Sequence, residues 1–523
     1  MVKDSAGMKK NISRTVFIVM VITLFARFFG LLREVLIAKY YGTSLYTDAY
    51  IIANNIPTVL FDTLGQALLT SFIPMYSRVR YSESRDRANV FTIRLMCCLL
   101  VICLFIIGLG ETFTKEVVYV FASGFKGEAL ETTIKFSRIL FPSLIAMTFL
   151  NVFTGYLQIY QKFEISTSVT IVGNLAIIVS LVISAHFNNI LIFVWGSLAG
   201  LFVQVFFLVP SVLKQGLFKN KCNILKIDIY VVRLIPLLIP VFIGSALNEI
   251  NSIVDRTMVS SVGTGAVSTL NYAYKVISLV ISVIVVPIIT ILYPKFSEYT
   301  SQNRAEKFKE SVNKSINYML AIIIPCTIIV ICFRGLIVKI LFERGNFGSI
   351  AAASTSKSLE YYSFGLIGMA IQQVLIRIFY SKQNTIIPMV NGVLCALVNI
   401  ALDYILINKF GIYGAAAATS VVAWIACVVL VMILCKKKII SVSYFGNMAF
   451  KNVASGTIMI IFLSCFNNLI SKNISFGFIN ILASLLATVI SIIIYLLLQI
   501  IFKNEDIADI FTDIVKGGCK RMR

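Results

Sequence analysis

Histidine and charged residues are scarce in this sequence, and their scarcity excludes several classes of protein. The only histidine is His186, and no two of the 11 cysteines form a Cys-x-x-Cys pair, so a histidine-built zinc site is excluded. No Gly-x-x-x-x-Gly-Lys-Ser/Thr segment occurs, which excludes a P-loop nucleotide site. Only 13% of the residues are charged, compared with about 25% in soluble proteins. So few polar residues could not cover the surface of a soluble chain of 523 residues.

Apolar runs fill the chain instead. Apolar residues make up 58% of it, and the mean hydropathy is +0.90. Runs of about 20 apolar residues, the length that crosses a bilayer, recur from one end to the other. The first begins near Thr15, contains Arg27 and lacks a small-residue cleavage site, so we expect a retained helix rather than a signal peptide. The sequence therefore predicts an all-α integral membrane protein.

We place about fourteen transmembrane helices along the chain, each near the length that a bilayer requires. They cover approximately residues 14–40, 47–77, 90–111, 131–158, 164–185, 189–213, 230–260, 265–293, 310–332, 353–380, 384–407, 411–434, 446–469 and 477–502.

The formal net charge of +22 favours a membrane topology rather than nucleic-acid binding. With the N-terminus in the cytoplasm, most Lys and Arg residues fall in loops on the inner side, as the positive-inside rule expects. Lys219, Lys221 and Lys226 are examples, and the three lysines 436–438 form another cluster. We therefore expect a multi-pass protein of the bacterial cytoplasmic membrane with both termini in the cytoplasm.

Two short matches indicate an internal repeat. Pro74 and Pro294 each lie in an apolar-x-Pro-x-aromatic-Ser segment, and Tyr160 and Tyr380 each stand two residues before a lysine. Both pairs are 220 residues apart, which predicts two six-helix lobes in a parallel repeat. The predicted domains are an N-terminal lobe over 1–215, a cytoplasmic linker over 216–229, a C-terminal lobe over 230–437, and two extra helices with a basic tail over 438–523.

Ionisable residues at membrane depth are costly and are candidates for function. In the first span Arg27 and Glu34 share a helix face, with Arg33 beside them, and Asp48 begins a polar stripe on the second span. Lys275 lies in the eighth span. Arginine matches phosphate oxygens, so a basic cavity suits an anionic head group. The alternatives are an internal ion pair and a contact with a partner helix.

A second group of polar residues offers hard oxygen ligands. It consists of Asp255, Asn399, Asp403 and Thr419, and such oxygens suit Na⁺ better than a transition metal. The alternative is ordinary hydrogen bonding between helices.

Several motifs resemble those of the MurJ/MviN family, which flips the peptidoglycan precursor lipid II. The segment from Arg27 to Glu34 resembles the opening signature of the family, as do Tyr41, Gly42 and Asp48. Further matches are Phe121 to Phe125, Arg138 to Pro142, Phe342 to Phe347 and Phe379 to Gln383. The resemblance covers nearly the whole chain.

The resemblance implies a flippase that works by alternating access, with two lobes around a cationic cavity and a groove for the polyprenyl tail on the last two helices. It implies cargo binding by Arg27, Arg33, Glu34, Asp48 and Lys275, and a sodium site at Asp255, Asn399, Asp403 and Thr419. Lys275 stands where the family commonly has arginine, which keeps the charge but loses the fork. We expect no other cofactor, no catalysis and a monomer in the lipid bilayer.

One departure from the family keeps a second cargo open. Many members carry an arginine pair shortly after the proline of the second span, where this chain has Phe61 and Asp62. The alternative function is therefore a flippase for another polyprenyl-linked oligosaccharide of capsule or surface polysaccharide. A cation-coupled drug exporter is disfavoured because such exporters have twelve spans and acidic cavities. A membrane enzyme is disfavoured because the loops are short.

Overall fold

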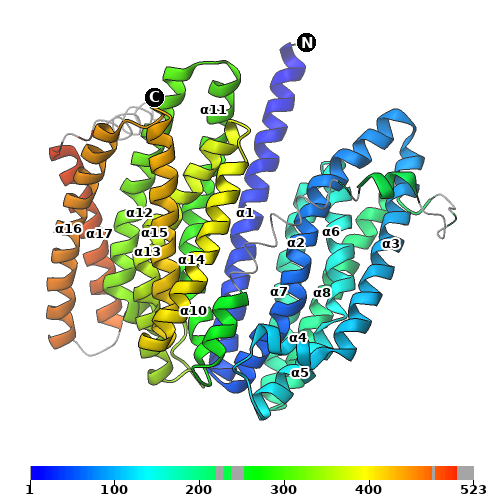
Figure 1. The fold of residues 1–523 in the computed structure, drawn as a ribbon, viewed down its shortest axis with the longest axis horizontal. Helices are drawn as coiled ribbons and strands as arrows, with labels where there is room; N and C mark the ends of the chain where they lie inside the picture. Colours follow the sequence, from blue (N-terminus) through cyan, green and yellow to red (C-terminus); the bar gives the residue numbers. More distant parts are fainter. Residues whose placement is uncertain are drawn as a thin grey trace. The chain divides into compact units, whose positions relative to one another are not determined.

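A computed structural model describes residues 2–219, 223, 228–234, 236, 253–473, 478–502 and 504, and they are helical with short turns between the helices (Figure 1). No strand occurs in these residues. The predicted all-α class is therefore confirmed. The predicted linker and the predicted span over 230–260 lie partly outside the described residues, and the tail beyond 504 lies wholly outside them.

The chain forms two compact units. Unit 1 contains residues 1–268 and Arg344–Phe347, and unit 2 contains residues 269–343 and 348–523. The domain boundaries predicted from the repeat are not tested by this division and stay a prediction.

Unit 1 begins with eight labelled helices. They are α1 (Val2–Tyr41), α2 (Leu45–Ser82), α3 (Arg85–Thr112), α4 (Thr114–Phe121), α5 (Glu128–Leu140), α6 (Ser143–Ile159), α7 (Phe163–His186) and α8 (Ile190–Lys214). Ser44 and Ser84 cap α2 and α3, since each side chain accepts a hydrogen bond from a backbone N–H of the first turn. Helix α7 packs against α1 and α8, and α6 packs against α2 and α8.

Unit 2 contains the later helices. They are α10 (Ala266–Val280), which starts at the end of unit 1, the π-helical turn η1 (Ile281–Val285), α11 (Val286–Ser301), α12 (Ala305–Leu341), α13 (Ser349–Ser381), α14 (Ile386–Phe410), α15 (Ile412–Lys436), α16 (Val442–Asn473) and α17 (Phe478–Ile501). Helix α13 packs between α12 and α15, and α14 packs on α15. The final pair, α16 and α17, packs on α12 and on each other.

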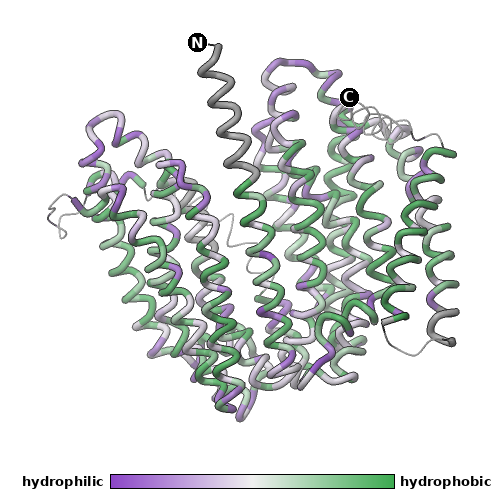
Figure 2. Tube along the Cα trace, turned by 180° about the vertical axis from the view of Figure 1, so that it is seen from behind, coloured by the Kyte–Doolittle hydropathy of each residue, from purple (hydrophilic) through white to green (hydrophobic). Residues whose placement is uncertain are grey.

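Ten described helices are long and apolar enough to cross a membrane, or eleven if one bent pair is a single span. Figure 2 shows the apolar residues along the middle of the helices and the polar residues mainly at their ends. The predicted spans over 14–40 and 47–77 fall in α1 and α2. The count of fourteen stays a prediction.

Two predicted spans are less regular than a single helix. Residues 131–158 form parts of α5 and α6, which meet at a 42° bend, because Pro142 cannot donate the backbone hydrogen bond that would continue α5. Residues 265–293 contain the π-helical turn η1 between α10 and α11. A periodicity of apolar residues does not reveal such local breaks.

The turns after α6 and α13 have the same backbone conformation. Gln161 and Gln383 both have φ +58°, and each donates its N–H to the carbonyl three residues earlier. These two glutamines are 222 residues apart, whereas the matching residues that indicated the repeat are 220 residues apart. The same left-handed turn also occurs at Asn188, Asn303 and Lys438, so it does not test the repeat, which stays a prediction.

Candidate functional site

Arg33 is the centre of a polar group in unit 1. Helix α1 presents Arg33 toward α7, where its Nη1 donates to Oδ1 of Asn174 at 3.1 Å. Its Nη2 lies 2.8 Å from Oε1 of Glu34. The Arg33 Nε is buried and has no hydrogen-bond partner among the described residues. The guanidinium is thus oriented by two groups, and its buried Nε is left without a hydrogen-bond partner.

Arg27 lies two turns earlier on the same helix. Its side chain is exposed, whereas Glu34 is buried and Arg33 is half-buried. The sequence predicted all three residues, but it did not indicate Asn174, because a single amide on an apolar helix has no local signature. The close approach of α1 and α7 is made at Gly30, where a Cβ would lie 3.7 Å from the Asn174 amide.

Asp48 contacts backbone amides. Its carboxylate oxygens accept hydrogen bonds from the N–H groups of Gly265 and Ser268, at 2.6 and 2.8 Å. An acidic side chain at the first turn of α10 suits the positive end of the helix dipole. Gly265 has φ +83°, and a Cβ there would lie 2.9 Å from the carbonyl oxygen of Thr43. In this structure Asp48 fixes a turn within unit 1.

Two glycines within the motifs that resemble the family, Gly124 and Gly345, lie where two backbone segments are in contact. A Cβ on Gly345 would lie 2.3 Å from the carbonyl oxygen of Lys39, and a Cβ on Gly124 would lie 2.3 Å from the backbone of Ser261. The backbone N–H of Asn346 donates to Lys39 at 2.9 Å. These motifs therefore hold the loops of unit 1 together.

Asn399 and Asp403 form a buried pair on α14 in unit 2. Both side chains have no exposed surface, and Nδ2 of Asn399 donates to Oδ2 of Asp403 at 2.8 Å. Asn391 and Cys395 continue the same stripe at intervals of four residues and are also buried. Thr419 lies on the neighbouring α15, where its hydroxyl donates to the Ala415 carbonyl at 3.0 Å. Asp255 belongs to unit 1.

The oxygen atoms of this pair are suitable ligands for a hard cation. Carboxylate, amide and hydroxyl oxygens are the ligands that such ions prefer. Among the described residues, no group of three His, Cys, Asp or Glu side chains could hold a metal ion. A sodium site would therefore depend on amide, hydroxyl or backbone oxygens besides the carboxylates.

Lys275 lies on α10 in unit 2 and is half-buried. Two aromatic residues position this part of the helix: the Tyr272 ring packs 5.1 Å from Phe342, and the Tyr274 ring packs 5.6 Å from Tyr362. Lys275 and Arg33 belong to different units.

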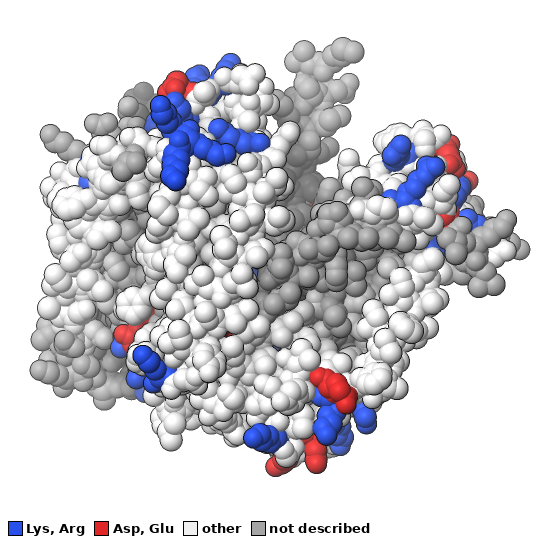
Figure 3. Space-filling view, viewed as in Figure 1, with Lys and Arg blue, Asp and Glu red and all other residues white. Residues whose placement is uncertain are grey.

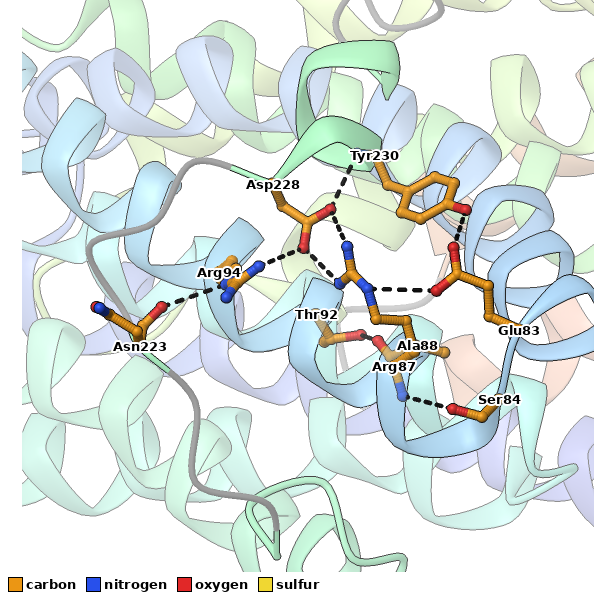
Figure 4. A network of polar contacts seen from close by, with 9 residues as sticks. All are labelled: Glu83, Ser84, Arg87, Ala88, Thr92, Arg94, Asn223, Asp228 and Tyr230. Carbon is orange, nitrogen blue, oxygen red and sulfur yellow. Dashed lines mark hydrogen bonds and ion pairs between the residues drawn. The ribbon is translucent and has the colours of Figure 1, made fainter.

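A further ionic network, which the sequence did not indicate, holds the end of the linker to α3 (Figure 4). Asp228 lies between Arg87 at 2.6 Å and Arg94 at 3.1 Å, and its side chain is fully buried. Burial alone would raise the pKa of the Asp228 carboxyl, but the hydrogen bonds from Arg87, the Tyr230 N–H and Arg94 hold that pKa below its usual range. The Tyr230 hydroxyl donates to Glu83, which also pairs with Arg87.

Known proteins resemble this chain over most of its length. The family model described as lipid II flippase MurJ matches residues 37–488. A probable lipid II flippase MurJ of Buchnera aphidicola subsp. Schizaphis graminum is 31% identical over 439 residues, which are 82% of this chain and 85% of that protein. The lipid II flippase MurJ of Burkholderia cenocepacia is 24% identical over 414 residues, which are 77% of this chain and 80% of that protein.

Solved structures show the same fold. A lipid II flippase MurJ in an inward closed conformation superposes with a TM-score of 0.80 at 24% identity, covering 93% of this chain and 99% of that one. An inward-facing multidrug transporter of the MATE family has a TM-score of 0.67 at 14% identity, covering 81% of this chain and 98% of that one. The family resemblance seen in the sequence is confirmed, and the chain belongs to the lipid II flippase MurJ family.

Proposed function

We propose that this protein moves lipid II from the inner to the outer leaflet of the bacterial cytoplasmic membrane by alternating access. The observation that carries the proposal is the Arg33 group, which holds an oriented guanidinium at membrane depth within a chain of this family. Arginine is suited to the pyrophosphate of the cargo because its planar fork matches phosphate oxygens.

The remaining residues extend this proposal. Arg27, Glu34, Asp48 and Lys275 complete the cationic cavity, and Asp255, Asn399, Asp403 and Thr419 provide a sodium site. The buried Asn399–Asp403 pair supports the sodium site, since a cation would offset the cost of a carboxylate in the membrane. We further propose fourteen spans, two lobes in a parallel repeat, both termini in the cytoplasm, and a monomer.

One observation supports the alternative cargo. At the place where many family members have an arginine pair, Phe61 is buried and packs with Cys103 and Leu144. A hydrophobic residue there makes the cavity less basic, which favours a flippase for another polyprenyl-linked oligosaccharide of the cell surface.

Depletion of the protein in its native cell distinguishes the two cargoes. If lipid II is the cargo, lipid II accumulates and cell-wall synthesis stops, and the wild-type gene restores both while Arg33→Ala at equal protein level does not. Accumulation of a different lipid-linked oligosaccharide with unchanged lipid II would contradict the main proposal and support the alternative.

A further inference from the structure

One end of unit 2 contains an open pocket of about 680 Å³ that none of the proposed cargo or sodium residues line. It lies between the start of α12 and the residues that follow α15. Its polar lining consists of three lysines, two glutamates, an amide and a hydroxyl: Lys307, Lys309, Lys438, Glu306, Glu310, Asn313 and Ser441. Figure 3 shows Lys and Arg side chains gathered at this end of unit 2, near α11 and α12.

The segments around the pocket carry a large excess of positive charge. They hold eight basic residues and two acidic ones: Arg304, Lys307, Lys309, Lys314, Lys382, Lys436, Lys437 and Lys438, against Glu306 and Glu310. Glu306 lies 2.8 Å from Lys309, and Glu310 lies 2.8 Å from Lys314. The two acids are thus already paired, and most of the positive charge is not balanced within the cluster.

Packing holds several of these lysines close to one another. The Lys382 Nζ lies 4.6 Å from the centre of the Phe308 ring, which is buried at the start of α12. Burial, together with the charges of Lys437 and Lys309, lowers the pKa of the Lys382 amine. Like charges kept this close repel one another, and an anion bound among them would remove the repulsion.

The backbone beside the pocket also places a lysine where glycine is favoured. Lys438 has φ +55° at the turn that ends α15, and its N–H donates to the Cys435 carbonyl. Glycine is the usual residue in this left-handed position. The next two residues, Ile439 and Ile440, are buried and form the apolar part of the lining.

We propose that this pocket binds the phosphate of an anionic phospholipid head group from the membrane leaflet at this end of unit 2. The lysines supply compact positive charges for phosphate oxygens, and basic pockets at the ends of membrane helices suit such head groups. The apolar lining by Ile439 and Ile440 suits a ligand that continues into acyl chains. This site is separate from the transport of lipid II and does not depend on it.

The test uses the purified full-length chain in neutral detergent. Lipid binding is measured by native mass spectrometry and by the shift in thermal unfolding on adding phosphatidylglycerol or phosphatidylcholine. We expect phosphatidylglycerol to bind and to raise the unfolding temperature more than phosphatidylcholine does. The double variant Lys307→Gln, Lys438→Gly should bind it about 30-fold more weakly, since each lysine near an anionic lipid contributes about fivefold. Glycine suits the backbone at 438, so the fold should persist.

A matched control removes two exposed lysines elsewhere, with Lys135→Gln on α5 and Lys409→Gln on α14. This control should bind phosphatidylglycerol as the wild type does. The proposal is overturned if the pocket variant and the control lose affinity equally, or if phosphatidylcholine binds as well as phosphatidylglycerol. It is also overturned if a few millimolar inorganic phosphate displaces the lipid, because the ligand would then be a soluble phosphate compound.

Discussion

Arg33 has the most specific surroundings of the residues proposed to bind the cargo. One neighbour is acidic, Glu34, and the other is neutral, Asn174. Glu34 compensates the charge of the guanidinium, and Asn174 fixes its direction from a second helix. This division of roles makes Asn174 a positioning residue rather than a ligand of the cargo.

Replacement of Asn174 by Ala should lower the affinity for lipid II without abolishing it. A hydrogen bond to a charged group contributes about 1.5–3 kcal/mol, which corresponds to roughly 10- to 100-fold in binding. Asn174→Asp, which keeps the acceptor, should retain more affinity than Asn174→Ala at equal thermal stability. Binding of lipid II to the purified variants measures the effect. Equal affinity for Asn174→Ala and wild type would contradict the role.

Asp228 should make the stability of the protein depend on pH. Its folded-state pKa is lowered, so the stabilisation is present above the unfolded value of about 3.9 and is lost as pH falls through the folded pKa. Asp228→Asn should therefore unfold at a lower temperature than wild type at pH 7. The difference between the two should begin to shrink when the pH falls below about 4 and should vanish below the folded pKa.

The unfolding temperatures of wild type and Asp228→Asn are measured in detergent between pH 7 and a pH below about 4. Glu306→Gln is a suitable control, because Glu306 is 86% exposed and such surface pairs contribute at most about 1 kcal/mol. A constant difference between wild type and Asp228→Asn at every pH would show that the ion pairs do not depend on this titration.

At the scale of helices, α14 is apolar enough to span the membrane and also carries a buried polar stripe. Asn391, Asn399 and Asp403 lie on one face, and Asn399 and Asp403 are joined by a hydrogen bond. Because a buried carboxylate is costly in a membrane, a cation near Asp403 would stabilise the folded state.

Sodium should raise the unfolding temperature of the purified protein more than potassium does at equal ionic strength. Asp403→Asn, which keeps the shape but removes the charge, should abolish the difference between the two ions. A binding ligand stabilises the folded state by mass action, so the shift should grow with sodium concentration. If Asp403→Asn responds to sodium as the wild type does, the ion binds elsewhere or not at all.

The last two helices are joined to α12 by buried amides. Asn452 on α16 donates to Asn317 on α12 at 2.9 Å and accepts from the Tyr495 hydroxyl of α17 at 3.0 Å. Asn317 and Asn504 exchange hydrogen bonds at 2.7 and 3.3 Å. At the other end of α16, Asn467 donates to the Cys332 carbonyl at 3.2 Å. Polar contacts at both ends thus set the register of α16 along α12.

A double-mutant cycle on Asn317 and Asn452 measures the interaction energy between α12 and α16 at this contact. Each replacement by Leu should destabilise the protein, and the coupling between the two should be about 0.6–1.7 kcal/mol, as for other hydrogen bonds between membrane helices. Thr457→Val is the matched control on α16, because its exposed hydroxyl bonds only within its own helix. Additive effects of the two replacements would contradict the coupling.

At the scale of the whole molecule, the chain forms two compact units and matches a family of lipid II flippases along most of its length. We propose that transport draws on ion gradients, on the membrane potential or on consumption of the cargo. The cell interior is electrically negative, so outward movement of an anionic head group is favoured by about 2.3 kcal/mol per charge at 100 mV.

Flipping should therefore require the membrane potential and should not require ATP. An ionophore that collapses the potential, added to cells or loaded vesicles at constant ATP, should stop the export of lipid II. Depletion of ATP with the potential maintained should leave it unchanged. Full export without a potential and without a sodium gradient would mean that consumption of the cargo on the outer side drives transport.

The sequence by itself determined the membrane class, the helical fold and the family, and it singled out the neighbouring pair Arg33 and Glu34. These follow from apolar runs, from spacing along one helix, and from motifs, all of which are local in the chain. Only the tertiary structure revealed Asn174 beside Arg33, the Asp228 network, and the amides that join α16 to α12. Their partners lie more than 130 residues away, and no local pattern records which polar groups meet when helices pack.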